Sequence, residues 1–589
     1  MNRRFWIPVF ALLLFASCTD LDIYNPELAN KAYNDSWKEV IGDIDPNQKW
    51  VTAKQVTANV AGLADGEYTL RVFTANSVQP ESRLVAEKTF DASCSITFDY
   101  PQSLTDAFVT IQGKAGLVVN GYYQIDGNNC INVNKTRTRA DETCPTYVAK
   151  EVQTSCSHDG VAIQDTYYYL GGVTTQPSAG WKKEDLSLLV GDNGVFQEEV
   201  NNYTIYKDVL GDDIRYKMNS TGPITLTYSF GATAFENMFG YLYYFDGESY
   251  ESAKRYILTD NLKPTNYITI NGERMTDDMG LSDKLVSVPD GATIAGTEFS
   301  LVYFDKDGKA SYDFPEGINV EFFIINKSGM GYTGQSEHQH TFYSTAEAEA
   351  AIGCKTPAVA HVAATTYNFG KTTVLSFEDA LRAPSFDNDM NDVMFFTTGD
   401  FNKPQEVVPE PIPTAQSWIL ACEDRGSVGD FDFNDVVFSV SHVAGTTKAI
   451  FTPLAAGGTI PSHVYFGNTC LGEIHALLGC EDSGKMINTN EISAEGTPTI
   501  IDVPEGFSMS TGSMGGFSIK VSNTTHAVVA APEAGEIPQM ICVDGTSWAW
   551  PREWVSIVRA YPEFGEWGAN YQTSTSWYLN PAEEALVVK

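Results

Sequence analysis

The sequence is poor in basic residues. It holds 38 Lys and Arg against 75 Asp and Glu, which gives a formal net charge of −37 at pH 7. Nucleic acids and anionic lipid surfaces are bound through clustered Lys and Arg. Neither is therefore expected as a partner, and the counterions of this chain should be cations.

Motifs of familiar catalytic and zinc sites are also missing. The sequence contains no C-x-x-C, G-x-S-x-G, H-E-x-x-H or G-x-x-x-x-G-K-[ST]. We therefore expect no enzyme, although a glycan-processing hydrolase remains open because its carboxylate pair is recognised by geometry. His338 and His340 beside Glu337 could hold zinc, but without a third identifiable ligand an exposed polar strand is the simpler interpretation.

Long hydrophobic runs are absent except at the N-terminus, "MNRRFWIPVFALLLFASC". Its apolar part is too short to span a bilayer and follows two arginines, which is typical of a secretion signal over residues 1–17. "FASC" is similar to a bacterial lipobox, which implies lipidation of Cys18, a tether over 18–36, and the outer membrane of a Gram-negative cell, with exposure at the cell surface as a further expectation. The alternative is a plain cleaved signal with an incidental cysteine.

Disulfides are permitted in an exported chain, and the sequence has ten cysteines including Cys18. Cys130, Cys144 and Cys156 are near enough in sequence for pairing. Their spacing does not determine the connectivity.

The fold is expected to be mainly β and multidomain, with antiparallel sandwich-like domains and few short helices. Short β-rich runs alternate with Gly, Asp, Asn and Pro along most of the chain. The expected organisation is an N-terminal β-sandwich (37–132), a linker (133–146), a middle β-rich region (147–400), a proline-rich linker (401–416) and a C-terminal β domain (417–589).

One helical pattern is expected near the C-terminus. Pro551 suits a first helical turn, and Trp554, Ile557, Val558 and Tyr561 would share a face. The many tryptophans of this region could stack on sugar rings, but they are more typical of the core of a small β domain.

Two acidic repeats are the most distinctive feature of the sequence. Each has a Glu-Asp pair after a short apolar run and then the pattern D-x-D-x-N-D-V-x-F, with a gap two residues longer in the first copy. The candidate ligands are Glu378, Asp379, Asp387, Asp389, Asn391 and Asp392 in the first repeat, and Glu423, Asp424, Asp430, Asp432, Asn434 and Asp435 in the second.

In an extended segment, Asp430, Asp432 and Asn434 would point to one side and Phe431 and Phe433 to the other. Crowded carboxylates repel one another unless a cation lies among them, and Ca²⁺ suits such hard oxygen ligands best. The first five positions resemble an EF-hand loop, but the sixth is aspartate where an EF-hand has glycine, so any calcium site is built differently. The simpler alternative is that these side chains cap turns and strand ends.

The repeat pattern, F-E-D followed by D-x-D-x-N-D-V-x-F, resembles two related groups of exported β-rich domains. The second copy, with "GEIHALLG", "WPREWVSIVRAYPEFGEW" and "WYLNP", is similar to the LruC domain of bacterial lipoproteins, and the first copy resembles a related domain of unknown function. The resemblance implies export and a β architecture but supplies little biochemical function.

Together these features predict an exported, lipid-anchored protein that binds Ca²⁺ and acts as a surface binding or adhesion module. The predicted partners are the outer membrane, through the lipid, and a glycan or protein ligand. Two alternatives are the hydrolase mentioned above and a structural subunit of a surface assembly.

Overall fold

The computed structural model describes part of the chain in detail. The described residues are 26–588 except for 78, 114–115, 135–144, 157–161, 172–174, 178–214, 231–236, 249–251, 263–267, 271–272, 276–296, 327–339, 344–361, 368–371, 378, 380–391, 401–412, 425–429, 512, 523–527 and 547. Cys18 and the signal sequence therefore lie outside the described residues. The expectation of a mainly β chain with few short helices is confirmed.

The N-terminal unit consists of two facing sheets. Val56, Ala58 and Val60 are buried at alternate positions of one strand, as a half-buried strand requires. The four-stranded sheet has the order β3-β2-β5-β6 and the three-stranded sheet the order β4-β1-β7, with β7 parallel to β1. The bounds are β1 (Ala53–Ala61), β2 (Glu67–Phe73), β3 (Leu84–Asp91), β4 (Cys94–Pro101), β5 (Asp106–Gly113), β6 (Gly116–Gln124) and β7 (Cys130–Asn134).

The middle unit contains a seven-stranded sheet, β11-β22-β14-β15-β9-β8-β23, which closes on itself because β22 also pairs with β23. Its strands are β8 (Thr146–Cys156), β9 (Ala162–Gly171), β11 (Tyr216–Lys217), β14 (Asn237–Tyr244), β15 (Arg255–Leu262), β22 (Asn319–Asn326) and β23 (His340–Tyr343). The pairs β15–β9 and β23–β8 are parallel, which differs from the expected antiparallel pattern.

A six-stranded sheet, β10-β18-β13-β26-β25-β24, completes the middle unit. Its strands are β10 (Thr175–Pro177), β13 (Thr225–Phe230), β18 (Thr297–Ser300), β24 (Val362–Tyr367), β25 (Thr372–Phe377) and β26 (Val393–Thr398). Three small pairs are β12 (Gly222–Pro223) with β21 (Asp313–Phe314), β16 (Ile268–Ile270) with β17 (Glu273–Met275), and β19 (Tyr303–Phe304) with β20 (Ala310–Ser311).

The C-terminal unit has a five-stranded sheet, β32-β29-β28-β27-β35, and a four-stranded sheet, β31-β30-β33-β34. The strands are β27 (Ser417–Cys422), β28 (Val436–His442), β29 (Lys448–Ala455), β30 (Ser462–Phe466), β31 (Thr469–Glu473), β32 (Thr499–Asp502), β33 (Phe517–Val521), β34 (Val528–Ala530) and β35 (Met540–Asp544). Short helices are α6 (Ile474–Leu477), α7 (Ile557–Ala560), α8 (Phe564–Ala569), η2 (Met514–Gly516), η3 (Trp577–Leu579) and η4 (Glu584–Leu586).

The tryptophans of this unit form its core, with one exception. Trp548, Trp550, Trp567 and Trp577 are buried, whereas Trp554 is 70% exposed. The expected terminal helix begins only at Ile557, so Trp554 lies before it and does not share its face.

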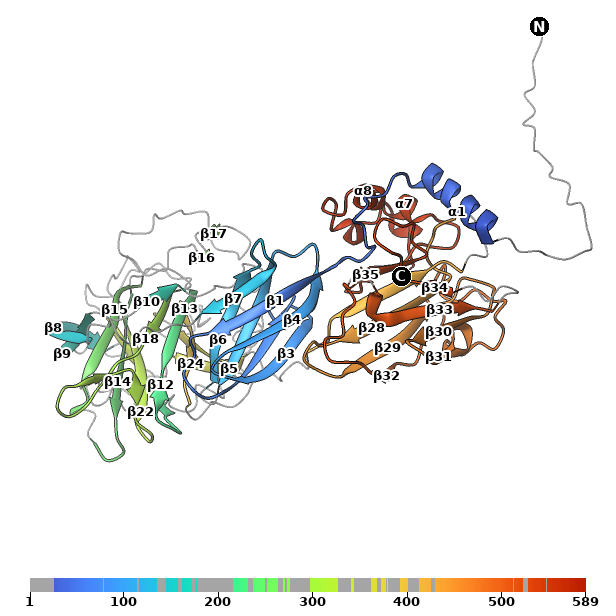
Figure 1. Ribbon diagram of the computed structural model, residues 1–589. Coiled ribbons are helices and arrows are strands. Elements are labelled where there is room, and N and C mark those ends of the chain that lie inside the picture. The colour runs from blue at the N-terminus through green and yellow to red at the C-terminus, as the bar shows by residue number, and fades with distance from the viewer. Residues whose placement is uncertain are drawn as a thin grey trace, which may run out of the picture.

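The segment expected to be a tether is partly folded. Pro26–Val40 forms helix α1, and Tyr33 and Trp37 belong to the core of the C-terminal unit. The Tyr33 hydroxyl donates to Pro538 O at 2.9 Å, and Trp50 Nε1 donates to Glu536 O at 2.7 Å. Figure 1 shows α1 beside α7 and α8, far from the rest of the N-terminal unit. The reason is that its aromatic face finds an apolar surface formed by residues some 400 to 500 positions later.

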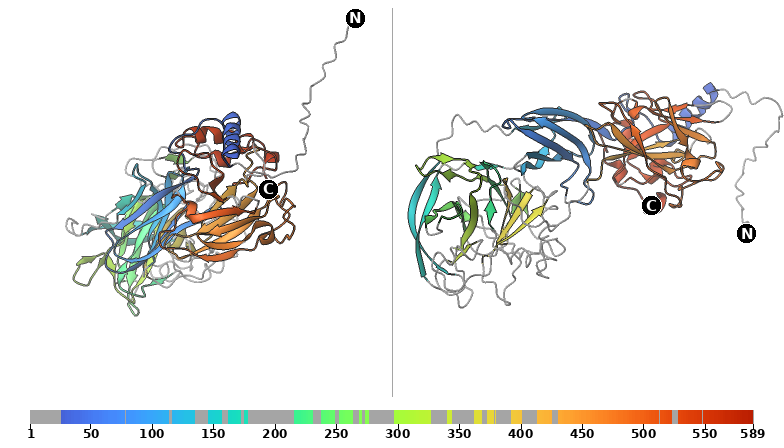
Figure 2. Two further views of the ribbon diagram at one scale, coloured as in Figure 1. Left: turned by 45° about the vertical axis from the view of Figure 1, so that its right-hand side comes forward. Right: turned by 90° about the horizontal axis from the view of Figure 1, so that it is seen from below.

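The three units are arranged in a row, with the N-terminal unit between the other two (Figures 1 and 2). The edge strand β3 binds the C-terminal part of the chain through backbone hydrogen bonds, Leu84 N to Thr414 O at 2.8 Å and Ala444 N to Val85 O at 2.9 Å. Asp99 of β4 accepts from Ser508 Oγ at 2.6 Å and from Met509 N at 2.5 Å. The N-terminal and C-terminal units are therefore joined by an extensive polar interface.

Candidate functional site

Both acidic repeats lie in the loops of antiparallel hairpins. The first loop joins β25 to β26, where Phe377 pairs with Val393, and the second joins β27 to β28, where Cys422 pairs with Val436. In each case the Glu-Asp pair directly follows the first strand and the last aspartate directly precedes the second. The sequence repeat is thus a repeat of local structure.

One hydrogen bond recurs in the two loops. The backbone N–H of Asp379 donates to Asp392 Oδ2 at 2.8 Å, and that of Asp424 donates to Asp435 Oδ2 at 2.6 Å. Each final aspartate therefore closes its loop across the hairpin. The capping role that the sequence left open is shown for these two residues.

The first repeat is described only at its two ends. Asp379 is 2% exposed and its Oδ2 accepts from Asn237 Nδ2 at 2.6 Å. Its carbonyl accepts from Asn326 Nδ2 at 3.1 Å, so the loop start is fixed to the neighbouring sheet. The other four candidates lie outside the described residues: Glu378, Asp387, Asp389 and Asn391.

The second loop is described from Asp430 onward and is not an extended strand. Phe431 and Phe433 have φ of 49° and 51°, in the left-handed region that bulky residues rarely adopt. Both rings are fully buried, and Phe431 lies 5.0 Å from Tyr33 and 5.4 Å from Trp37 of α1, measured between ring centroids. The rings and the carboxylates are therefore separated, as expected. The separation comes from left-handed backbone at alternate residues, and packing of the rings offsets the strain of that backbone.

The carboxylates of the second loop are buried and hold backbone groups. Glu423 Oε1 accepts from Phe433 N at 2.7 Å, and Asp432 Oδ2 accepts from Trp554 N at 2.8 Å. Glu423 and Asp432 are each 2% exposed. Among the described residues, no Lys or Arg forms an ion pair with Glu423, Asp432 or Asp435.

Burial and mutual repulsion make these groups hard to ionise. Burial, and then the charges of Asp435, Asp432 and Asp430, raise the pKa of Glu423 well above its usual range. Burial and the Asp430 charge raise the pKa of Asp432 to about 8. Burial and the Asp424 charge likewise raise the pKa of Asp435. Either protons or a cation must relieve this repulsion.

Glu553 joins this cluster from a distant part of the sequence. Burial, followed by the charges of Asp430 and Asp424, raises its pKa to about 7. Sequence inspection missed it because it lies in the tryptophan-rich segment, with no local acidic pattern around it. Its neighbour Trp554, bonded to Asp432, is what brings it to the loop.

The side-chain oxygens of the second loop are of the kind that bind a hard cation, and one of them is a buried hydrogen-bond acceptor without a donor among the described residues. Asn434 is fully buried and its Oδ1 has no hydrogen-bond partner among the described residues. A Cβ atom at Gly457 would lie 2.2 Å from Asn434 Oδ1, and one at Gly458 would lie 2.3 Å from Asp424 Oδ2, so only glycine fits beside these oxygens at the turn. Carboxylate and amide oxygens without nitrogen or sulfur favour Ca²⁺ over zinc.

The side chains as they stand do not converge on one point. In the described part of the chain, no group of three or more His, Cys, Asp or Glu residues is placed to hold a metal ion. A cation at the loop would therefore require side-chain rotation.

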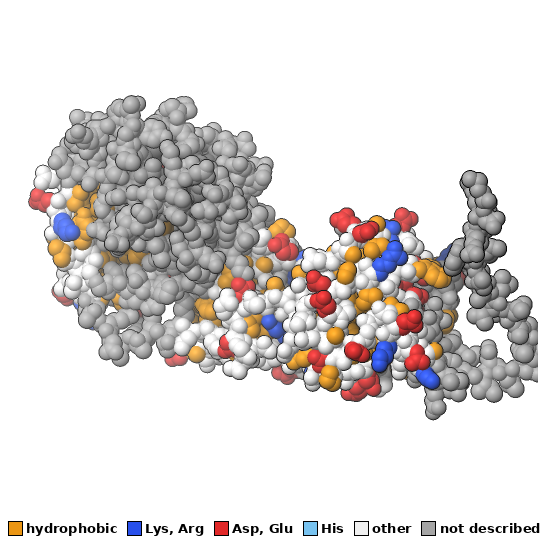
Figure 3. All heavy atoms as spheres, turned by 90° about the horizontal axis from the view of Figure 1, so that it is seen from above, with side chains coloured by type: hydrophobic (Ala, Val, Ile, Leu, Met, Phe, Trp, Pro, Cys, Tyr) orange, Lys and Arg blue, Asp and Glu red, His pale blue; other side chains and the backbone are white. Residues whose placement is uncertain are grey.

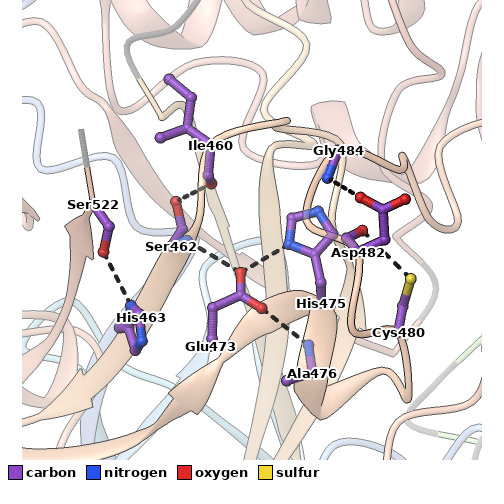
Figure 4. A network of polar contacts seen from close by, with 10 residues as sticks. All are labelled: Ile460, Ser462, His463, Glu473, His475, Ala476, Cys480, Asp482, Gly484 and Ser522. Atoms are coloured by element: carbon purple, nitrogen blue, oxygen red, sulfur yellow. Dashed lines mark hydrogen bonds and ion pairs between the residues drawn. The ribbon is translucent and has the colours of Figure 1, made fainter.

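A second polar network involves Glu473 and His475, shown in Figure 4. His475 Nδ1 lies 2.8 Å from Glu473 Oε1, and Glu473 Oε2 accepts from Ala476 N at 3.0 Å, which caps α6. Burial would raise the pKa of Glu473, but the hydrogen bonds from His475, Ala476 and Ser462 outweigh it and lower the pKa. His475 is fully buried, so this pair is a structural cap.

Other expected features have simple outcomes. Cys130 is a free thiol, so the pairing considered for it does not form, whereas Cys144 lies outside the described residues. Glu337 and His338 also lie outside them.

Acidic side chains are spread over the face of the C-terminal unit drawn in Figure 3. Among the described residues, no helix has the length and apolar character of a membrane span.

Comparisons with known proteins add little. No protein-family model and no curated protein matches the chain. Among solved structures, the chain is similar to a proposed cell adhesion protein from Parabacteroides distasonis, with 10% identity over 49% of this chain and 79% of the other and a TM-score of 0.09. At that score the likeness carries no argument about fold or function.

Proposed function

We propose that this chain is an exported, lipid-anchored protein that binds Ca²⁺ at its acidic hairpin loops and acts as a surface binding or adhesion module. We also propose that its C-terminal unit is related to the LruC domain, on the motifs given above. The observation that carries the calcium proposal is the second loop, where among the described residues the buried carboxylates of Glu423 and Asp432 form no ion pair with Lys or Arg and Asn434 Oδ1 is buried without a hydrogen-bond partner.

Calcium and capping are compatible at this loop. Each capping carboxylate uses one oxygen for a backbone N–H and keeps a second one. Ca²⁺ accepts six to eight oxygen ligands in flexible geometry, and it would neutralise carboxylates that burial makes costly to ionise.

The calcium proposal is tested by thermal melting of the full chain in calcium and in chelator. Tryptophan fluorescence reports mainly on the C-terminal unit, whose core holds most of the tryptophans. For a Kd of about 10⁻⁴ M and roughly 2 mM calcium, binding adds about 1.8 kcal/mol to the free energy of unfolding. We expect the melting temperature to rise by roughly 4 to 7 °C. Identical melting in both conditions would refute calcium binding.

The full chain is needed for this test because residues 417–589 alone lack Tyr33, Trp37 and Trp50, which complete the core of the C-terminal unit. The matched variant is Asp432→Asn with Asp435→Asn, in which the amides keep acceptor oxygens but remove two charges. It should lose the calcium-dependent shift and stay folded in chelator.

The anchor is tested separately. Cys18→Ala should release the protein from the membrane fraction and abolish labelling with a palmitate analogue. Unchanged partition and labelling would contradict lipidation without affecting the calcium proposal.

A further inference from the structure

Trp554 differs from the other described tryptophans in its exposure. Its side chain is 70% exposed, whereas the remaining described tryptophans are at most 7% exposed: Trp37, Trp50, Trp418, Trp548, Trp550, Trp567 and Trp577. Among the exposed large apolar side chains in the described part of the chain, it is the only aromatic one. A flat apolar surface is therefore presented to solvent without contributing to the core.

This tryptophan lies in a tight turn at a position where glycine is usual. The Val555 N–H donates to the Arg552 carbonyl at 2.9 Å, which closes a four-residue turn over residues 552–555. Trp554 is the third residue of that turn and has φ of 68°. Glycine adopts a positive φ at this position without steric cost, whereas a bulky side chain there strains the backbone.

Packing of the ring does not offset this strain. The other bulky residues with positive φ are Trp50, Phe431, Phe433 and Met514, and each has a side chain at most 1% exposed. Burial of those side chains stabilises the fold and balances the cost of their backbone conformation. Trp554 gains no such burial, and backbone strain that the fold does not explain is typical of a functional position.

The turn is fixed by hydrogen bonds that do not require tryptophan. The Glu553 N–H donates to Thr489 O at 3.0 Å, and the Trp554 N–H donates to Asp432 Oδ2 at 2.8 Å. Both donors belong to the main chain, so glycine at position 554 would form the same bond. These bonds explain the conformation of the turn but not the residue in it. They also hold the backbone that carries the ring, which lowers the conformational entropy lost when a ligand binds.

Polar side chains flank the ring in the turn. Arg552 and Glu553 are both half-buried, and they supply hydrogen-bond donors and acceptors respectively. No other large apolar side chain of residues 551–563 is exposed, so this segment does not offer the apolar patch found at the centre of a protein interface. A sugar ring has an apolar face that stacks on an aromatic ring, and hydroxyls that both donate and accept hydrogen bonds. The turn therefore suits a glycan.

The charge of the chain distinguishes between kinds of glycan. The formal net charge is −37, and acidic side chains are spread over the C-terminal unit (Figure 3). Sialylated and sulfated glycans would be repelled by this charge. An uncharged glycan would not.

We propose that the turn over residues 552–555 binds a neutral glycan, which stacks on the Trp554 ring and forms hydrogen bonds with Arg552 and Glu553. This inference rests on the surface-binding role proposed above and names the class of its ligand. The strained tryptophan is retained because its ring contacts the ligand.

Binding of the full chain to an array of immobilised neutral, sialylated and sulfated oligosaccharides tests this assignment. We expect the wild type to bind neutral members, and Trp554→Ala to bind them about tenfold more weakly or less. Trp554→Phe keeps an aromatic ring and should lose less. Ile500→Ala is the matched control, because Ile500 is 69% exposed in the same unit, and it should bind as the wild type does.

Trp554→Gly separates the ligand from the fold. It removes the ring and places the residue that suits a positive φ, so binding should be lost while the melting temperature stays unchanged or rises. A lower melting temperature would show that the ring supports the fold and would overturn the proposal.

Fluorescence locates the bound sugar. The emission of the wild type minus that of Trp554→Phe isolates the signal of Trp554. Addition of the neutral oligosaccharide that binds best on the array should move this difference to shorter wavelength, because the sugar removes water from the ring. Binding without such a change would place the sugar elsewhere and overturn the site.

The remaining outcomes separate this inference from the surface-binding role. Wild-type binding in Trp554→Ala, or binding of sialylated or sulfated members only, would overturn the site and leave that role intact. Binding to an array of deglycosylated extracellular proteins, without binding to any oligosaccharide, would overturn the glycan as ligand and also leave the role intact. Absence of binding on both arrays would overturn both proposals.

Discussion

At the scale of single residues, the acidic loop combines capping with charge crowding. Asp435 and Asp392 occupy equivalent places in their loops and accept equivalent backbone bonds. Asp432 and Glu423 also accept hydrogen bonds from backbone N–H groups, and both lie at buried positions in the second loop. These carboxylates therefore shape the loop even before any ligand is considered.

The stability of the C-terminal unit should depend on pH in the absence of calcium. A carboxyl whose pKa is raised by folding gives stability that is present below its unfolded pKa and is lost as pH rises through the folded pKa. For Asp432 that window runs from about 4 to about 8. In chelator, we expect the melting temperature to fall between pH 5 and pH 8.

Calcium should reduce this fall, because it binds the ionised carboxylates. Asp432→Asn should also flatten the profile in chelator, since the amide does not titrate. A melting temperature that rises with pH in chelator would contradict the raised pKa values.

Loss of a loop-closing cap should be visible at one amide. Asp435→Ala removes the acceptor of the Asp424 N–H and should cost about 1 to 3 kcal/mol, because that donor is left unpaired in a buried loop. Hydrogen exchange at Asp424 should accelerate correspondingly. Asp435→Asn keeps an acceptor and should lose much less.

The equivalent change in the first hairpin, Asp392→Ala, should accelerate exchange at Asp379 and leave Asp424 unaffected. Fast exchange at neither amide would indicate that the caps contribute little.

At the scale of elements, α1 and the second acidic loop depend on each other. Trp37 lies 5.4 Å from Phe431 and 6.5 Å from Phe433 between ring centroids. The same two phenylalanines carry the positive φ angles of the loop. The helix therefore covers the apolar side of the segment whose polar side carries the carboxylates.

Trp37→Ala should release α1 from the C-terminal unit. Loss of a fully buried tryptophan side chain lowers the free energy of unfolding by about 3 to 5 kcal/mol. This loss is large compared with the free energy that holds a single helix against its unit. We expect the amides of residues 27–40 to exchange much faster and the unfolding transition followed by tryptophan fluorescence to move to a lower temperature. Lys38→Ala, at an exposed position of the same helix, is the control and should leave both unchanged. Unaltered exchange in Trp37→Ala would show that α1 is held by other contacts.

The strands were predictable from sequence because their side chains alternate, as Val56, Ala58 and Val60 do. The hairpin position of the acidic repeats also follows from the apolar runs on either side of them. The docking of α1 was not predictable, because the partners of Tyr33 and Trp37 lie some 400 to 500 residues away. Glu553 was missed because no acidic pattern surrounds it in the sequence and its loop lies more than 100 positions earlier. The positive φ of Phe431 was not predictable because burial of its ring overrides the local backbone preference.

At the scale of the whole molecule, the N-terminal unit is bound to a unit that follows it by hundreds of residues. Asp99 links them, since it accepts from Ser508 Oγ at 2.6 Å and from Met509 N at 2.5 Å. The middle unit is inserted between these two partners in sequence and contacts the N-terminal unit through β26 and β6.

Asp99→Ala should loosen the N-terminal unit from the C-terminal unit without unfolding either. Four donors at residues 508–510 would lose their acceptor, at about 1 kcal/mol each. We expect faster exchange at Met509 and Ser510 and a larger radius of gyration by small-angle scattering. Asp91→Ala, at an exposed position of β3, is the control. Equal scattering curves for the variant and the wild type would show that the backbone pairing of β3 suffices.

The docking of α1 also determines how the molecule responds to mechanical force. A pull on the N-terminal end reaches the rings of Tyr33 and Trp37 before it reaches any strand of the N-terminal unit, because β1 begins only at Ala53. If α1 is peeled away, the chain from Pro26 to Val40 can extend to roughly 50 Å, while Gln48 and Trp50 remain bonded to the C-terminal unit. That length is released before the sheets carry load, so the first event under tension is elongation of the leader segment and exposure of the apolar side of the acidic loop.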